Sequence, residues 1–126
     1  MLTLILPFPP TINSYYGTIK TGKFYKQYIK QAGKHYRTQV ITHINSLDIP
    51  LHANIPLSVS ILLNFPTNHR NDLDNRLKAL LDALTHSEVW EDDSLIDELI
   101  VRRGEVIKGG IATVTISPYI SPYISD

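Results

Sequence analysis

Residues 57–84 read LSVSILLNFPTNHRNDLDNRLKALLDAL and contain two consecutive patterns that decide the fold. From Leu57 to Phe65, apolar side chains alternate with polar ones, which predicts a β-strand with one buried face. From Leu77 to Leu84, leucines recur at steps of three and four, which predicts an amphipathic helix. A short polar loop joins the two segments, so we expect a buried strand that leads directly into a helix.

The flanking sequence predicts more strands and a second helix. Three further segments have the residue pattern of strands, namely 2–6, 95–103 and 111–116. The last two are joined across Lys108-Gly109-Gly110, so we expect them to form a hairpin. Apolar steps of three and four predict a helix from about Lys26 to Leu47, after a loop or irregular hairpin over residues 11–22.

This order of elements predicts an α+β protein. We expect a mixed β-sheet of about four strands with two main helices, in a single domain over residues 1–126. Residues 117–126 repeat Ser-Pro-Tyr-Ile and are expected to form a tail. Trp90 follows the second predicted helix and is expected at the rim of the core.

Composition is that of an ordinary globular protein. The chain has 126 residues, of which 43% are hydrophobic and 19% charged, and this length allows one core. Cysteine is absent, which excludes thiol catalysis and thiolate metal sites and fits a reducing cytoplasm. The apolar N-terminus is broken by prolines and no stretch approaches the roughly 18 apolar residues of a membrane span. We therefore expect a soluble, cytoplasmic protein with no membrane partner.

Charge is segregated along the chain, although the net charge is zero. Lys and Arg but no acid precede Asp48, whereas seven acids and no Lys or Arg lie between Asp82 and Glu98. A basic segment is typical of phosphate binding, and a nearby acidic cluster suits metal-assisted chemistry on that phosphate. The alternative is a basic helix that merely faces solvent. Tyr15 and Tyr16 could stack on exposed bases or equally cover an edge of the core.

Carboxylates frame the predicted helix at 77–84. Asp72 and Asp74 precede it, and Asp92 and Asp93 follow it. Like charges held close together repel, and Mg²⁺ is bound by one or two carboxylates with phosphate oxygens and water, so a metal site explains the concentration of acids. In the alternative interpretation, Asp72 or Asp74 is the helix N-cap, and the lysine one turn on pairs with its neighbours.

The spacing excludes two other kinds of metal site. An EF-hand loop needs glycine five residues after its first aspartate, and Leu77 stands in that place after Asp72. Zinc is bound by Cys or by closely spaced His, and the sequence has no Cys and no pair of His at helical ligand spacing.

Ordered motifs run along nearly the whole chain: Leu6-Pro7-Phe8-Pro9-Pro10 with Asn13 and Tyr15, Asp72-Leu73-Asp74-Asn75 with Lys78, Asp82-Ala83-Leu84, Trp90 with Asp92 and Asp93, and Lys108-Gly109-Gly110. In this order they resemble the RusA family of Holliday-junction resolvases. The resemblance implies a Mg²⁺-dependent endodeoxyribonuclease, with Mn²⁺ as an alternative metal, that resolves four-way DNA junctions by paired nicks in recombination and repair. It also implies a homodimer, because two nicks on opposed strands need two sites related by a twofold axis.

The resemblance also assigns residues by position. Asp72, Asp74 and Asp93 match the metal-binding catalytic carboxylates of the family, and Lys78 matches its essential lysine. The family often has an arginine directly before the first aspartate, whereas this chain has Asn71 there and an arginine one residue earlier. Candidate DNA contacts are polar or basic residues of the motifs and of the basic segment: Asn13, Lys26, Lys30, Lys34, Arg37, Arg70 and Arg76.

Two other functions compete with a nuclease. The first is a module that binds nucleic acid without cutting it, in which the acids form a structural cluster. The second is a transferase whose Asp-x-Asp motif holds a nucleotide diphosphate through a metal. Against the transferase, 126 residues leave little room for a nucleotide-binding fold, and a Gly-rich phosphate loop is absent from the sequence.

Overall fold

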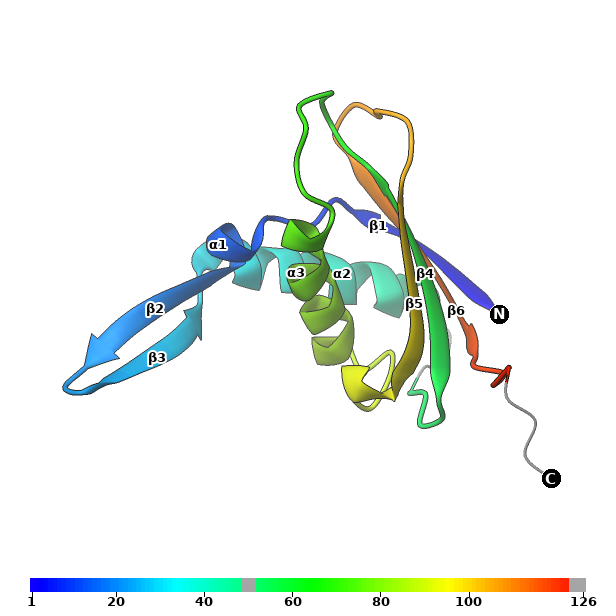
Figure 1. Ribbon diagram of the computed structural model, residues 1–126, viewed down its shortest axis with the longest axis horizontal. Helices are drawn as coiled ribbons and strands as arrows, with labels where there is room; N and C mark the ends of the chain where they lie inside the picture. Colours follow the sequence, from blue (N-terminus) through cyan, green and yellow to red (C-terminus); the bar gives the residue numbers. More distant parts are fainter. Residues whose placement is uncertain (49–51, 123–126) are drawn as a thin grey trace.

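The computed structural model describes residues 1–48 and 52–122. Its elements are β1 (Leu2–Pro7), α1 (Ile12–Tyr15), β2 (Tyr16–Thr21), β3 (Phe24–Ile29), α2 (Gln31–Ser46), β4 (Leu57–Asn64), α3 (Asp74–His86), the 3-10 helix η1 (Asp93–Leu95), β5 (Ile96–Arg103) and β6 (Ile111–Pro118). The α+β class, the mixed sheet and the two main helices, α2 and α3, are confirmed (Figure 1). β6 includes the first residues of the predicted tail, and residues 123–126 of that tail lie outside the described residues.

Four strands form the main sheet in the order β1-β6-β4-β5. β6 pairs antiparallel with both β1 and β4, and β5 pairs parallel with β4. The predicted hairpin between 95–103 and 111–116 is therefore wrong, because β4 lies between these strands. Their connection crosses the end of β4, where the Gly104 amide donates to the Leu63 carbonyl at 2.9 Å. Strand β4 lies between β6 and β5, and its alternate apolar side chains are buried.

One face of this sheet carries the core. Val59, Ile61 and Leu63 of β4 are fully buried and belong to one apolar cluster with Val40 of α2 and Leu80 of α3. The register places the buried residues of β1 and β6 on this same face. Helices α2 and α3 therefore cover one face of the sheet, and the polar residues that alternate along β4 lie on the other.

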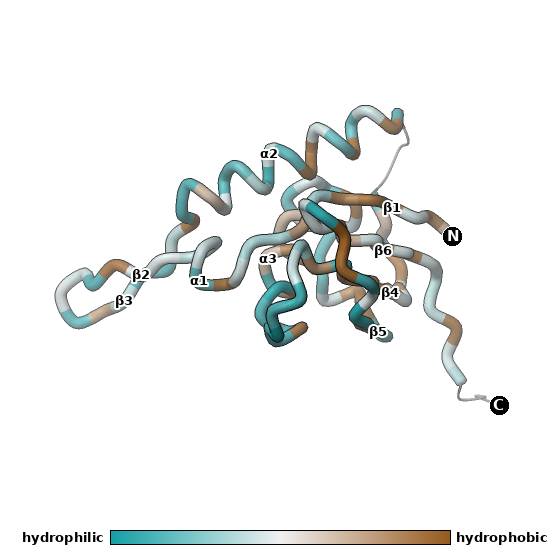
Figure 2. The backbone as a smooth tube through the Cα atoms, turned by 90° about the horizontal axis from the view of Figure 1, so that it is seen from above, coloured by the Kyte–Doolittle hydropathy of each residue, from teal (hydrophilic) through white to brown (hydrophobic). Residues whose placement is uncertain are grey.

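Strands β2 and β3 form a separate two-stranded sheet, which we call the arm (residues 16–29). The arm projects away from the body of the molecule (Figures 1 and 2). The helix predicted from about Lys26 begins only at Gln31, and the segment predicted as loop or irregular hairpin contains α1 and β2. Aromatic residues of β3 favour a strand, and Gly22, at a φ of 61°, forms the turn between the two strands.

Two aromatic side chains are more deeply buried than the sequence predicts. Trp90 is fully buried rather than at the rim, and its Nε1 donates to Thr85 Oγ1 at 2.7 Å. Tyr15 is also fully buried. Of the two interpretations of this residue, stacking on exposed bases or packing at the core, the second is therefore correct. Each has a polar group that reaches a partner from inside the core, which permits complete burial. Within the described residues, no helix is long and apolar enough to cross a membrane.

Candidate active site

Asp72 and Asp74 lie where the chain passes from β4 into α3. The loop after β4 is exposed, and α3 begins at Asp74. The N-cap position is occupied by Leu73, so the prediction that Asp72 or Asp74 is the N-cap is wrong. Asp74 instead stands in the first helical turn, where the helix dipole favours negative charge. Both carboxylates are therefore available for interactions other than capping.

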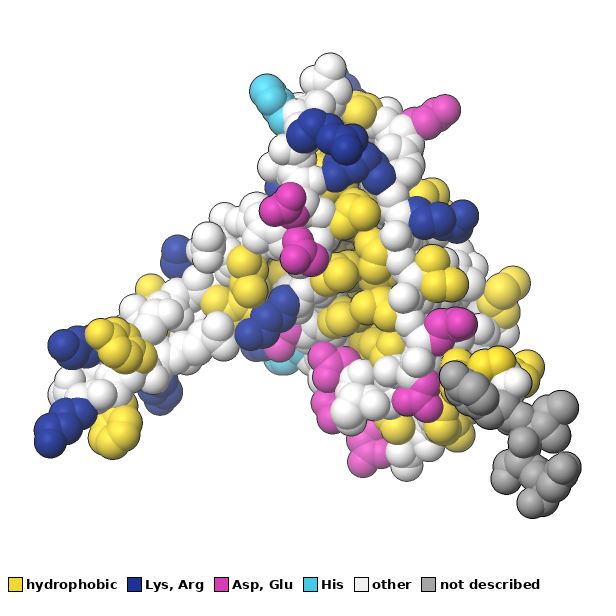
Figure 3. Space-filling view, in the orientation of Figure 1, with side chains coloured by type: hydrophobic (Ala, Val, Ile, Leu, Met, Phe, Trp, Pro, Cys, Tyr) yellow, Lys and Arg dark blue, Asp and Glu magenta, His cyan; other side chains and the backbone are white. Residues whose placement is uncertain are grey.

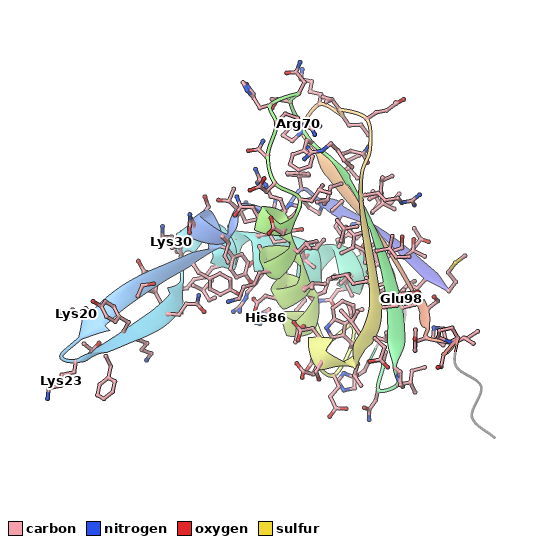
Figure 4. All side chains as sticks on the ribbon, viewed as in Figure 1. Lys20, Lys23, Lys30, Arg70, His86 and Glu98 are labelled. Atoms are coloured by element: carbon pink, nitrogen blue, oxygen red, sulfur yellow. The ribbon has the colours of Figure 1, made fainter. Side chains whose placement is uncertain are left out.

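An open pocket surrounds these two aspartates. Its volume is about 550 Å³, and its lining includes Arg70, Asp72, Asp74 and Arg103. Arg70 extends from the loop between β4 and α3 (Figure 4). Arg103 comes from the end of β5, where it donates to the carbonyl of Asn71. The pocket thus brings two carboxylates and two guanidinium groups together from segments distant in the sequence.

Arg103 is a site residue that the sequence did not indicate. Its guanidinium lies 4.3 Å from the centroid of the Phe65 ring and is held at the pocket by the Asn71 carbonyl. β4 and β5 pair in parallel, so both strands end at the same edge of the sheet. The sequence placed Arg103 at a strand end, but only the parallel pairing puts that end beside the loop that carries the aspartates.

Lys78 lies one helical turn beyond Asp74 and is exposed. Its Nζ is 4.7 Å from the centroid of the Tyr16 ring, at the base of the arm. In the described part of the chain, Lys78 forms no ion pair, so pairing with its helix neighbours is not observed. Burial and the nearby Asp82 raise the pKa of the Tyr16 phenol to about 12, and the ring stays neutral at physiological pH. The ammonium group therefore remains available to an external anion.

Asp82 lies further along α3 and has a different environment. Its Oδ2 accepts hydrogen bonds from Arg37 Nη2 at 2.6 Å, from Arg37 Nε at 3.1 Å and from the Tyr15 hydroxyl. Burial alone would raise the pKa of Asp82, but these hydrogen bonds outweigh it and lower the pKa below its ordinary value of 3.8. Asp82 therefore holds α3 to α2 and α1.

The third candidate metal ligand, Asp93, stands at the start of η1. Partial burial and the carboxylates of Asp92 and Asp82 raise the pKa of Asp93. Among the described residues, no three His, Asp or Glu side chains lie close enough to hold a metal ion. The structure therefore brings Asp72 and Asp74 into one pocket but does not bring Asp93 to them. Two carboxylates with phosphate oxygens and water still match the ligands that Mg²⁺ takes.

The candidate DNA contacts do not form one helical stripe. Lys26 is on β3 of the arm, Lys34 is on α2, and Arg37 is engaged by Asp82. Between them, Lys30 is the residue before α2, and its Nζ donates to the Asn13 carbonyl at 2.8 Å. The prediction of one continuous basic helix face was wrong, because the segment around Lys26 belongs to strand β3 and helix α2 begins only at Gln31.

Arg76 is partly buried rather than freely exposed. Its Nη1 donates to the Pro9 carbonyl at 2.9 Å, and its guanidinium lies 5.0 Å from the centroid of the Phe8 ring. Burial lowers the pKa of Arg76, and its Nε is buried without a partner in the described structure. These contacts join α3 to the segment after β1.

The sequence matches known proteins over most of its length. The family model described as Endodeoxyribonuclease RusA matches residues 7–117. The crossover junction endodeoxyribonuclease rusA of Enterobacteria phage HK97 is 37% identical over 106 residues, covering 84% of this chain and 85% of the relative. The protein of the same name from Escherichia coli O139:H28 is 32% identical over 115 residues, covering 91% of this chain and 92% of the relative. The chain therefore belongs to the RusA family of endodeoxyribonucleases.

Proposed function

We propose that this chain is a divalent-metal-dependent endodeoxyribonuclease that nicks four-way DNA junctions as a homodimer. The observation that carries the proposal is the pocket in which Asp72 and Asp74 lie with Arg70 and Arg103, in a chain of the RusA family. Carboxylates bind hard cations and guanidinium groups bind phosphate, so one pocket offers ligands for both. The relatives are named for crossover junctions, and we carry that substrate over to this chain.

The metal we propose is Mg²⁺, with Mn²⁺ able to replace it. Asp72 and Asp74 would hold it together with water and an oxygen of the scissile phosphate. When bound, such an ion activates water and neutralises charge on the phosphate. We assign Asp93 as the third ligand.

Lys78 and the two pocket arginines act on the phosphate in this proposal. Lys78 is one turn from Asp74 and carries a charge that no carboxylate of the described chain neutralises. It can therefore stabilise negative charge that develops on the phosphate during cleavage. Arg70 and Arg103 hold the phosphate in the pocket by charge-assisted hydrogen bonds. The exposed Lys26, Lys30 and Lys34 extend the DNA-binding surface, as proposed from the sequence.

For the homodimer, we propose that β5 pairs with β5 of a second copy. β5 is an edge strand whose Leu99 and Ile100 are 42% and 45% exposed, and exposed apolar edge strands favour pairing with another chain. A twofold axis through Ile100 would place Glu98 of each copy opposite Arg102 of the other, on the same face of the sheet. The strand is thus self-complementary in charge, and Glu98 is exposed along it (Figure 4).

A symmetric crosslink tests this pairing. Because the chain has no cysteine, Ile100→Cys introduces one thiol, and it should form an intermolecular disulfide under mild oxidation. The matched control is Ile5→Cys on β1, the opposite edge strand, where the side chain is 57% exposed. Equal crosslinking at both positions, or crosslinking only at Ile5→Cys, would contradict β5 pairing.

Cleavage assays test the nuclease function itself. The protein is incubated with labelled four-way junction, linear duplex and single-stranded DNA, in Mg²⁺ or in EDTA. We expect paired nicks in the junction in Mg²⁺, and binding without cleavage in EDTA. Junction binding without cleavage in either Mg²⁺ or Mn²⁺ would instead indicate the non-catalytic binding module.

A further inference from the structure

The arm is held together almost entirely by its own strand pairing. Each residue from Thr18 to Tyr28 is exposed. The two strands pair antiparallel over their whole length, with Thr21 opposite Phe24 at the tip. At about 3.3 Å per residue, six residues extend the tip roughly 20 Å from the base. Figure 1 shows this arm standing clear of both the sheet and the long helices.

The arm carries large apolar side chains that pack against nothing in the body. Phe24 is 78% exposed and Tyr25 is 71% exposed, and both lie next to the turn. Ile19 and Tyr28 add further exposed apolar surface along the strands. Large apolar side chains gathered on one exposed element favour a binding site. In Figure 3, apolar and basic side chains lie side by side at the tip of the arm.

One of these aromatic rings is held in place by the arm itself. Tyr28 lies opposite Gly17 in the register, and a Cβ added to Gly17 would come within 2.3 Å of the Tyr28 ring. Glycine at this position therefore makes room for the ring to lie across β2. A ring already fixed on the arm loses less conformational entropy when it binds a partner. The arm thus presents Tyr28 as a preorganised aromatic ring.

The charge of the arm indicates the kind of partner. Lys20, Lys23 and Lys26 lie on it, and residues 16–29 contain no acid. Figure 4 shows Lys20 and Lys23 near the tip. Two such arms would repel each other, whereas a polyanion attracts them. Aromatic rings between lysines are the arrangement that binds unstacked bases and the phosphates beside them.

We infer that the arm binds the branch point of a DNA junction, where Phe24 stacks on a base exposed by the interrupted helix and the lysines contact the flanking phosphates. The inference rests on the proposed function, since it takes the junction as ligand. Phe24 has no hydrogen-bonding group with which to contact a base edge, but its ring can stack on an exposed base of any sequence. Bases in a linear duplex already stack on one another, and opening that stack costs energy. The arm therefore favours a junction over a duplex.

The arm is also connected to the proposed catalytic residues. Tyr16 at its base lies beneath the Lys78 ammonium, 4.7 Å from ring centroid to Nζ. Tyr15, directly before the arm, donates a hydrogen bond to Asp82 of the same helix. The arm is thereby fixed relative to α3, and its length of roughly 20 Å sets how far the branch point lies from the pocket.

Binding measurements in EDTA test the inference without cleavage. The full-length protein is titrated against a four-way junction and a linear duplex, each with 2-aminopurine at the corresponding position, beside the branch in the junction. We expect Phe24→Ala to weaken junction binding by about 5- to 150-fold, the equivalent of one lost base stack, and to abolish the fluorescence change at the branch. Duplex affinity should stay the same. Ile120→Ala, at a side chain that is 87% exposed, is the control and should match wild type.

Two conservative variants separate stacking from simple apolar contact. Phe24→Tyr keeps an aromatic ring and should keep both affinity and fluorescence change, whereas Phe24→Leu should lose both. Junction binding by Phe24→Ala equal to that of wild type overturns the inference. So does a Phe24→Leu protein that binds normally, or a Phe24→Ala protein that instead dissociates into monomers on sedimentation, since the arm would then contact a second copy. A wild-type protein without junction preference overturns the proposed function first, and the inference with it.

Discussion

Asp74 and Asp82 stand on the same helix, about two turns apart, and differ in what surrounds their carboxylates. Asp82 accepts hydrogen bonds from Arg37 and Tyr15, which lower its pKa and join three helices. Asp74 is exposed in an open pocket with Asp72, and it forms no ion pair within the described structure. A carboxylate balanced by its neighbours supports the fold, whereas an unbalanced one is free to bind a cation. Position on the helix does not distinguish these roles, but the surrounding charges do.

The largest expected effect is on cleavage by Asp74→Asn. Asparagine keeps the shape of the side chain but removes the negative charge that a hard cation requires. Junction cleavage in Mg²⁺ should fall below detection, while the midpoint of chemical unfolding stays close to that of wild type. Asp48→Asn, at an exposed turn residue with a φ of 50° that asparagine also adopts, is the matched control and should cut normally. Normal cleavage by Asp74→Asn would exclude it as a ligand.

A smaller loss of activity is expected for Lys78→Ala. This change removes the ammonium group that lies on α3 between Asp74 and Asp82. Loss of one electrostatic stabiliser should slow junction cleavage by about 100-fold or more. Its contact with the Tyr16 ring contributes only about 0.5–1 kcal/mol at an exposed site, so stability should change little. Single-turnover cleavage rates measure the effect. Lys78→Arg keeps the charge and should retain more activity; equal rates for Lys78→Ala and wild type would exclude the catalytic role.

For Asp82→Asn the expected effect is on stability instead. The change weakens the hydrogen bonds from Arg37 and Tyr15 and leaves a partly buried guanidinium without its ion pair. We expect the free energy of unfolding to fall by about 2 kcal/mol, measured by urea denaturation. In a double-mutant cycle with Arg37→Ala, the two losses should not add. A variant as stable as wild type that fails to cut would assign Asp82 to the active site and reverse the comparison.

The dependence of stability on pH gives the smallest expected effect. The folded-state pKa of Asp82 lies below its ordinary value of 3.8, so its contribution is present above that pH and is lost as the pH falls through the folded pKa. Unfolding of wild type should therefore become easier below about pH 4, with a steeper slope than for Asp82→Asn. Identical slopes for wild type and Asp82→Asn would contradict the pKa shift.

The sequence predicted the parts of this site that follow from local periodicity and motif. The alternation from Leu57 to Phe65 located β4, the leucine spacing located α3, and the Asp-x-Asp motif lay at the start of that helix. Arg103 could not be assigned to the pocket from the sequence. It lies 29 residues or more beyond both aspartates, and only the parallel pairing of β4 and β5 brings it there.

The two main errors of the sequence-based prediction, in the arm and in the pairing of β5 with β6, both arose because local residue spacing does not reveal which strands pair. The arm was predicted in part as helix because Lys26 and Ile29 fit the helical spacing of the following residues, yet aromatic β-formers and Gly22 favour a hairpin. The predicted hairpin of β5 and β6 was wrong because a short connection can pass over the end of a third strand. Local spacing gives the period of a segment, but not its partner.

By itself the sequence determined the α+β class, the strand and helix that carry the aspartates, and membership of a nuclease family, because periodicity and motifs depend on neighbours in the chain. Only the tertiary structure decided that β4 is central, that Trp90 is buried, that Arg37 neutralises Asp82, and that Arg103 reaches the pocket. Each of these depends on contacts between distant segments, which burial of apolar surface selects across the whole chain. That Asp74 has no ion-pair partner in the described structure, whereas Asp82 has one, is therefore a property of the fold rather than of the motif.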